Sequence, residues 1–199
     1  SLNRAIKSID PYGAITQYLY DGNGNIIEEI NPKGYKTQYV YDSLDRLTKF
    51  IDEDGGVTTY ENDALGNITA ITDPKGNKSS YIYNYKVNQV EKVIGANNQI
   101  LLNKYDEIGN ITELTLPDGN IKKYKYDNLY RLSEMTDING VITNTKYDPL
   151  GRITYMKEST NREYFYEYDL NGNLLKTKDP LGYQVNYTYN KRNELTSIT

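Results

Sequence analysis

The sequence contains no histidine and no cysteine, and these two absences exclude several kinds of active site. Without them the chain cannot build a Ser-His-Asp or Cys-His catalytic group, a disulfide framework or the commonest zinc sites. Tryptophan is also absent, phenylalanine occurs twice, and only 37% of the residues are hydrophobic. The thick aliphatic interior usual for a globular chain of 199 residues is therefore missing.

An excess of charge of one sign is lacking as well. The 23 basic and 27 acidic residues give a net charge of −4, and the basic residues are spread evenly. This distribution argues against a nucleic-acid partner. The sequence also has no apolar run long enough for a membrane span and no signal peptide. We expect no cofactor.

Tyrosine, in contrast, occurs 22 times, and most of it belongs to a repeat. The dipeptide Tyr-Asp, or a close variant, recurs at positions 20, 41, 62, 83, 105, 126, 147, 168 and 189, with intervals of 21 residues and one of 22. One supersecondary unit copied along the chain gives this pattern. We expect residues 1–199 to be a single repeat array whose units start near these positions.

Each unit opens with a turn signature. Gly, Asn or Asp, which accept a positive φ most readily, usually stands three residues after the Asp, and an aliphatic residue follows two places later. The Asp can accept a hydrogen bond from the backbone amide two residues on. Because the later position is aliphatic in every unit, we predict that its side chain is buried. The clearest signature residues are Tyr20, Asp21, Gly24, Ile26, Tyr41, Asp42, Leu47, Gly66, Ile68, Tyr105, Asp106, Gly109, Tyr126, Asp127, Leu132, Tyr147, Asp148, Gly151, Ile153, Tyr168, Asp169, Gly172 and Leu174. Tyr130 replaces the Gly in its unit and predicts a strained or differently built turn.

A second turn follows eleven residues after the Tyr, as in Asp73-Pro74-Lys75-Gly76. Asp at the first place, Pro at the second and Gly at the fourth are typical of a type I turn. The pattern is missing at 94–98, where we place the extra residue of the long interval, and at 158–161. We expect irregular loops at both.

The segments between the turns are six or seven residues long and alternate with period two, as in Thr16, Tyr18 and Tyr20. We therefore predict an all-β fold of about 18 strands, in which tandem antiparallel β-hairpins of about 21 residues form a long, curved, coiling single-layer sheet. A parallel β-helix with one unit per rung is the alternative, which the hairpin-type turns disfavour. Tyrosine rings would cover such a thin sheet, and its end strands could pair with other chains.

The units resemble the YD repeat of the Rhs family, most clearly at residues 147–154 and 168–174 with the turn 179–182. That family includes bacterial wall-associated and polymorphic toxin proteins, shell components of insecticidal toxin complexes, and teneurins. The resemblance implies a β-strip that coils into a hollow shell, often around a toxic C-terminal polypeptide, in a secreted or cell-wall-associated bacterial protein. The partners it implies are the neighbouring repeats and a C-terminal cargo domain. Since the chain starts and stops within units, we expect an internal fragment of a much longer protein.

Catalysis is not expected. The family's aspartyl self-cleavage element uses two closely spaced Asp-Pro-x-Gly turns, whereas those at Asp73 and Asp179 lie far apart. Carboxylate-pair hydrolysis is disfavoured because Asn replaces the repeated Asp at positions 84 and 190, which a turn allows and charge chemistry does not. The run at 21–25 resembles a calcium loop but lacks its later Gly and acidic residue. We predict no catalytic, cofactor or metal residue.

A carbohydrate or cell-surface binding module is the alternative function, because exposed aromatic rings flanked by polar residues can stack on sugars. Cross-strand packing also explains Tyr residues that recur in register. The tyrosines outside the register separate the two hypotheses: convergence on one exposed patch favours binding, and scattered positions favour a scaffold. The candidates are Tyr12, Tyr35, Tyr130, Tyr155 and Tyr183.

Overall fold

The computed structural model describes residues 4–199 and has 19 strands, with no helix in this part of the chain. All belong to one open antiparallel sheet that is not closed into a barrel, which confirms the predicted fold class. The strands are β1 (Lys7–Ile9), β2 (Ile15–Tyr20), β3 (Ile26–Ile30), β4 (Lys36–Tyr41), β5 (Leu47–Ile51), β6 (Val57–Asn62), β7 (Ile68–Thr72), β8 (Lys78–Asn84), β9 (Gln89–Ile94), β10 (Ile100–Tyr105), β11 (Ile111–Thr115), β12 (Ile121–Tyr126), β13 (Leu132–Thr136), β14 (Ile142–Tyr147), β15 (Ile153–Glu158), β16 (Glu163–Tyr168), β17 (Leu174–Lys178), β18 (Gln184–Tyr189) and β19 (Leu195–Ile198).

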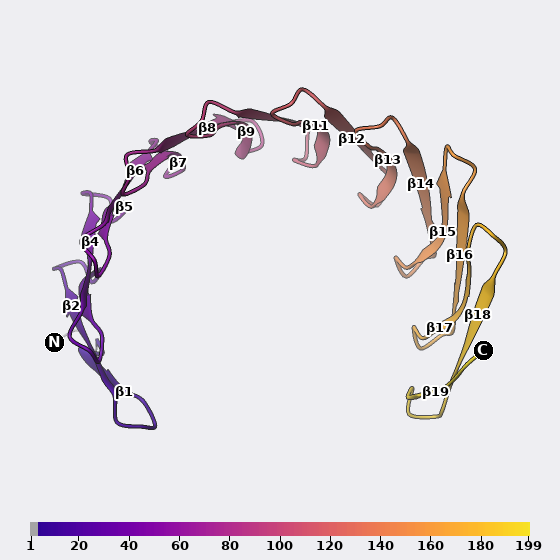
Figure 1. Cartoon of the computed structure of the whole chain (residues 1–199), viewed down its shortest axis with the longest axis horizontal. Helices are drawn as coiled ribbons and strands as arrows, with labels where there is room; N and C mark the ends of the chain where they lie inside the picture. Colours follow the sequence, from indigo (N-terminus) through magenta and orange to yellow (C-terminus); the bar gives the residue numbers. More distant parts are fainter. Residues whose placement is uncertain (1–3) are drawn as a thin grey trace. The chain divides into compact units, whose positions relative to one another are not determined.

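The chain divides into two compact units, one made of Ser1–Asn84 with Val90–Ile100 and the other of Tyr85–Gln89 with Leu101–Thr199. In the first unit each strand from β1 to β8 pairs with the next in the chain, and in the second the same holds from β10 to β19. Figure 1 shows these meanders strand by strand. Because all these pairs are antiparallel, the parallel β-helix is excluded.

Both kinds of turn have the same backbone. In the turn that opens at Asp148, the amide of Gly151 donates to the carbonyl of Asp148 at 3.0 Å, and the amide of Asp148 donates to the carbonyl of Arg152 at 2.9 Å. The turn at Asp179 repeats these bonds with Gly182 and Tyr183. In these two turns the fourth residue has a positive φ, as in a type I turn followed by a left-handed bulge residue. The two turn signatures in the sequence therefore encode one structure.

The predicted irregular loops are wrong. At 95–98 the amide of Asn98 donates to the carbonyl of Gly95, and at 158–161 the amide of Asn161 donates to that of Glu158, as in the regular turns. Asn98 (φ 61°) and Asn161 (φ 64°) hold the left-handed place of the missing Gly. Asn tolerates this conformation, so the turn forms without the Asp-Pro-x-Gly pattern. The extra residue of the long interval lies instead near Asn88 (φ 50°), which stands one place later than Gly24 does in its unit.

Tyr130 is strained but its turn is not built differently. Its amide donates to the carbonyl of Asp127 at 2.9 Å, as a Gly would, while its φ is 60°. A bulky side chain in the left-handed region crowds its own backbone. The expectation of a strained or differently built turn is thus confirmed by the strained conformation of Tyr130.

The aliphatic side chains that follow each Tyr-Asp turn are less buried than the sequence predicted. Residues such as Ile26, Leu132 and Ile153 are half-buried, and Leu195 is 51% exposed. Ala70 is the only hydrophobic residue with full burial among those described. The surface is 13736 Å², whereas a compact protein of this mass exposes roughly 9,600 Å². A single layer has no second layer to cover it, so each side chain is protected only by its neighbours in the sheet.

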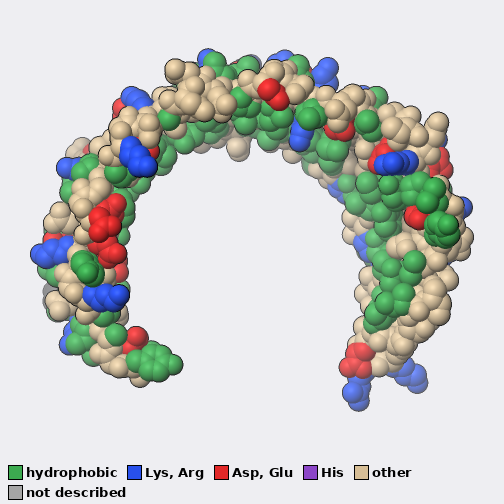
Figure 2. Space-filling view, viewed as in Figure 1, with side chains coloured by type: hydrophobic (Ala, Val, Ile, Leu, Met, Phe, Trp, Pro, Cys, Tyr) green, Lys and Arg blue, Asp and Glu red, His purple; other side chains and the backbone are tan. Residues whose placement is uncertain are grey.

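The two faces of the sheet differ in composition. Tyr18 and Tyr20 of β2 lie on the half-buried face, while Gln17 and Leu19 point to the exposed one. On this second face Lys and Glu of neighbouring strands pair repeatedly, as in Lys36–Glu28 (3.0 Å). Further pairs between neighbouring strands are Lys104–Glu113, Lys125–Glu134, Lys157–Glu163 and Lys176–Glu167. Lys78 of β8 reaches across β7 to Glu61 of β6 at 2.6 Å. Figure 2 shows charged side chains beside hydrophobic ones along the strands.

Candidate functional site

The most regularly repeated feature of the described residues is the Tyr-Asp turn. In the turn at Asp148, one carboxylate oxygen accepts the amides of Leu150 (2.9 Å) and Arg152 (3.0 Å). Asp179 accepts the amides of Leu181 and Tyr183 in the same way. Because one oxygen binds two amides of its own turn, the Asp fixes the turn without help from distant residues. The predicted amide two residues on is confirmed as a donor.

Asn can replace this Asp, as the sequence suggested. At the last turn, the side-chain oxygen of Asn190 accepts the amides of Arg192 (2.8 Å) and Glu194 (3.1 Å). The interaction needs an acceptor and no negative charge. The repeated carboxylates therefore serve the backbone of their own turns.

Five of the signature tyrosines bond to a carbonyl fifteen residues earlier. The hydroxyl of Tyr126 donates to the carbonyl of Ile111, fifteen residues earlier, at 2.9 Å. Four further tyrosines make the same bond: Tyr20 to Ala5, Tyr83 to Ile68, Tyr147 to Leu132 and Tyr189 to Leu174. Where Asn62 stands in place of Tyr, its side-chain amide donates to the carbonyl of Leu47 at 3.1 Å. The position thus requires a donor at the tip of the side chain, and its ring covers the sheet.

Arginine at the fifth place of a turn links that turn to the next, a role that the sequence analysis missed. Arg152 binds Asp148 through Nε at 2.6 Å and donates to the carbonyl of Asp169 in the next turn at 2.8 Å. Its guanidinium also lies 4.7 Å from the centre of the Tyr168 ring. Arg131 repeats all three contacts one unit earlier. The signal was in the sequence, since Arg46, Arg131 and Arg152 share one place in their units.

These contacts determine how the turn carboxylates titrate. The hydrogen bond from Arg46 lowers the pKa of Asp42 from its ordinary value to about 2. The side-chain hydrogen bond from the fifth turn residue also lowers the pKa of Asp21, Asp73, Asp127 and Asp169. These groups stay ionised at neutral pH, the opposite of the raised pKa that a general acid requires. Groups of three or more acidic side chains placed to hold a metal ion do not occur in the part of the chain that the structure describes.

The five candidate ligand-facing tyrosines stand in different turns and strands of the two units. In the first unit, Tyr12 lies in the β1–β2 turn (96% exposed) and Tyr35 follows the β3–β4 turn (52% exposed). In the second unit, Tyr130 lies in the β12–β13 turn, Tyr155 is half-buried within β15, and Tyr183 follows the turn at the other ends of the strands. This scatter favours the scaffold interpretation.

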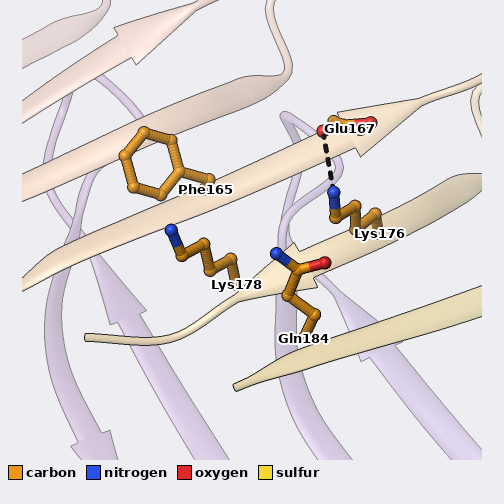
Figure 3. A pocket seen from close by; sticks show the side chains of 5 residues that line it. All are labelled: Phe165, Glu167, Lys176, Lys178 and Gln184. Atoms are coloured by element: carbon orange, nitrogen blue, oxygen red, sulfur yellow. Dashed lines mark ion pairs between the residues drawn. The ribbon is translucent and has the colours of Figure 1, made fainter. Parts of the chain in front are cut away.

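A hollow on the charged face of the second unit was not expected from the sequence. Phe165, Glu167, Lys176, Lys178 and Gln184 line it, and its volume is about 210 Å³. Figure 3 shows these side chains on three neighbouring strands, β16, β17 and β18, with Glu167 and Lys176 joined as an ion pair. An adjoining hollow of about 260 Å³ shares Phe165 and Lys178 and extends to the turn 179–182.

Solved structures with this fold come from toxin complexes. The chain aligns with crystal structures of TcdB2-TccC3 and of TcdB2-TccC3-Cdc42, each at a TM-score of 0.60 and 16% identity, over 97% of this chain and 13% of that one. A Tc holotoxin pore of Photorhabdus luminescens with a mutated TccC3 aligns at a TM-score of 0.56 and 18% identity, over 92% of this chain and 10% of that one. The chain therefore spans about an eighth or less of these relatives. A comparison with curated sequences finds no match.

A match in sequence, and not the fold alone, shows the family of this chain. A family model described as "RHS Repeat" matches residues 20–57, 41–78, 105–142 and 168–199, which together make up more than half of the chain. Together with the sheet of repeated hairpins, this match supports a structural role for the chain. This chain belongs to the RHS repeat family.

Proposed function

We propose that this chain is a segment of the wall of an Rhs shell that encloses a C-terminal polypeptide of the same, much longer protein. The observation that carries the proposal is the open sheet of near-identical hairpins with almost no core of its own. A globular binding domain would bury its apolar residues in an interior, whereas a wall needs only contacts between neighbouring repeats. Its mechanism is physical enclosure.

The same proposal covers partners and location. The neighbouring repeats and the enclosed polypeptide are the partners, and the protein is a secreted or cell-wall-associated bacterial protein. RHS membership and the fold shared with toxin-complex structures support this assignment. The structure has no membrane-spanning helix among residues 4–199.

A carbohydrate-binding function is the weaker candidate. It depended on Tyr12, Tyr35, Tyr130, Tyr155 and Tyr183 lying together, and they occupy separate turns and strands. We therefore retain enclosure as the function of the segment.

Limited proteolysis of the parent protein tests enclosure. We expect the C-terminal polypeptide to resist a protease that digests the same polypeptide when it is expressed alone. A parent protein with these 199 residues deleted is the control and should lose the protection. Equal digestion of the C-terminal polypeptide in the intact parent and by itself would refute enclosure.

A further inference from the structure

One row of side chains on the charged face of the second unit differs from the Lys-Glu pairs around it. Reading across the strands β14 to β18, directly opposed residues are Lys146, Tyr155, Phe165, Lys178 and Gln184. Tyr155 and Phe165 have ring centres 5.0 Å apart, and the ammonium groups of Lys146 and Lys178 lie 5.4 and 5.6 Å from the nearer ring. Two cations thus border an aromatic pair.

Two lysines line the hollow, Lys176 and Lys178. The hydrogen bond from Lys157 and, to a smaller extent, the charge of Lys178 lower the pKa of Glu163, so Lys178 lies near this carboxylate without forming an ion pair with it. Lys178 is exposed, and its ammonium contacts the Phe165 ring and forms no ion pair among the residues that the structure describes. Glu167 pairs with Lys176, and Glu163 pairs with Lys157 at 2.7 Å. An ammonium beside an aromatic ring in an open hollow favours a ligand carboxylate.

The remaining lining mixes apolar side chains with the carboxylates of Glu163, Glu167 and Asp179 and the ammonium group of Lys176. Phe165 is 38% exposed and Leu181 is 81% exposed, and Pro180 completes the apolar part of the adjoining hollow. Gln184 offers one amide group, which can donate to and accept from a peptide bond. The volume of this hollow, about 210 Å³, is smaller than the roughly 300 Å³ or more of typical small-molecule pockets. It is large enough for one side chain of a ligand.

We propose that the two hollows bind an extended peptide in which a carboxylate side chain neighbours a large apolar one. The carboxylate pairs with Lys178, the apolar side chain packs on Phe165 and Leu181, and Gln184 bonds the peptide backbone. The carboxylates of the lining already have partners: Asp179 holds the amides of its own turn, and Glu163 and Glu167 are in ion pairs. Few polar groups are therefore left for the many hydroxyls of a sugar. The identity of this peptide as part of the enclosed polypeptide rests on the proposed function.

The test is titration of the isotope-labelled 199-residue chain with short synthetic peptides, followed by NMR and calorimetry. A peptide with alternating Glu and Leu should shift the amide signals of β16–β18 selectively, and its Gln-Leu counterpart should bind at least five-fold more weakly. Lys178→Met and Phe165→Leu should each lower the affinity for the acidic peptide at least five-fold.

Two variants serve as matched controls. Lys123→Met removes an exposed Lys from the same face of the same unit, where it lies opposite Glu113. Phe50→Leu removes the other Phe, whose ring centre lies 5.5 Å from that of Tyr39. Both should bind like the unmodified chain. Equal affinity for the acidic and neutral peptides, equal binding by Lys178→Met, or binding of an oligogalacturonate but not of the peptide would each overturn the proposal. Because these titrations use the chain alone, a negative result leaves the protease protection of the parent protein to be judged separately.

Discussion

At the residue scale, the turn sequence determines almost everything about the local backbone. Asp148 accepts two amides of its own turn, and a residue with positive φ follows at the fourth place. Among residues 4–199, six positions with a positive φ carry a residue other than Gly: Asp45, Asn88, Asn98, Tyr130, Asn161 and Asn193. Five of these are Asp or Asn, which tolerate this region, and Tyr130 alone is bulky.

Tyr130→Gly should therefore stabilise the chain. Relief of the left-handed strain exceeds the added entropy of Gly in the unfolded chain, so we expect a gain of about 0.5–1 kcal/mol in the free energy of unfolding. Urea denaturation followed by circular dichroism measures this change. Tyr183→Gly is the control, because Tyr183 is similarly exposed but has no positive φ, and this variant should gain nothing. A lower midpoint for Tyr130→Gly would show that its ring makes contacts worth more than the strain.

Acid should unfold the chain through the turn carboxylates. The pKa of Asp42 is about 2, and those of Asp21, Asp73, Asp127 and Asp169 are also lowered in the folded chain. A group whose folded pKa is depressed contributes stability above its unfolded pKa of roughly 3.9, and this contribution is lost as pH falls toward the folded value. We expect the urea midpoint to fall between about pH 5 and pH 2. A midpoint constant over that window would contradict these assignments.

At the element scale, each hairpin is joined to its neighbours by the tip of a signature side chain as well as by the backbone ladder. Tyr126 reaches the carbonyl of Ile111, and Arg152 reaches the carbonyl of Asp169. The sequence predicted the strands and the Tyr face from their period of two. It did not predict these tip contacts, because they depend on which strand ends lie beside each other.

Tyr126→Phe should separate the hydroxyl bond from the packing of the ring. Loss of the bond to Ile111 leaves a carbonyl with one partner fewer, and we expect a cost of about 1 kcal/mol in urea denaturation. Tyr124→Phe is the control on the same strand and face, since the Tyr124 hydroxyl has no protein partner among residues 4–199. Equal effects of the two substitutions would assign the stability to the rings and not to the hydroxyl bond.

At the scale of the whole molecule, the excess of exposed surface is the dominant property. The chain exposes 13736 Å², and among the described residues only Ala70 (2% exposed) and Glu28 (9% exposed) are buried. Stability therefore comes from the sum of contacts between neighbouring strands. Glu28 is tolerated there because Lys36 and Gln38 bind its two carboxylate oxygens.

Small-angle X-ray scattering of the isolated chain tests this property. We expect a radius of gyration well above the roughly 16 Å of a compact domain of this length. In a concentration series, growth of the particle would indicate pairing through the sheet edges, which we predict, and a constant size would contradict it. A compact globule near 16 Å would contradict the open sheet itself.

The sequence by itself determined the repeat length, the antiparallel strands, the turn type and the family, because each depends on residues close together in the chain. The sequence did not predict features that depend on contacts between residues far apart in the chain. The aliphatic row of Ile26 and Leu132 was expected to be buried and is half-buried, since burial requires a second layer that the tertiary structure does not have. The contacts of Arg152 and the hollow at Phe165 and Lys178 arise only when strands from different hairpins lie side by side. Register and the exposure of each face were therefore decided by the tertiary structure.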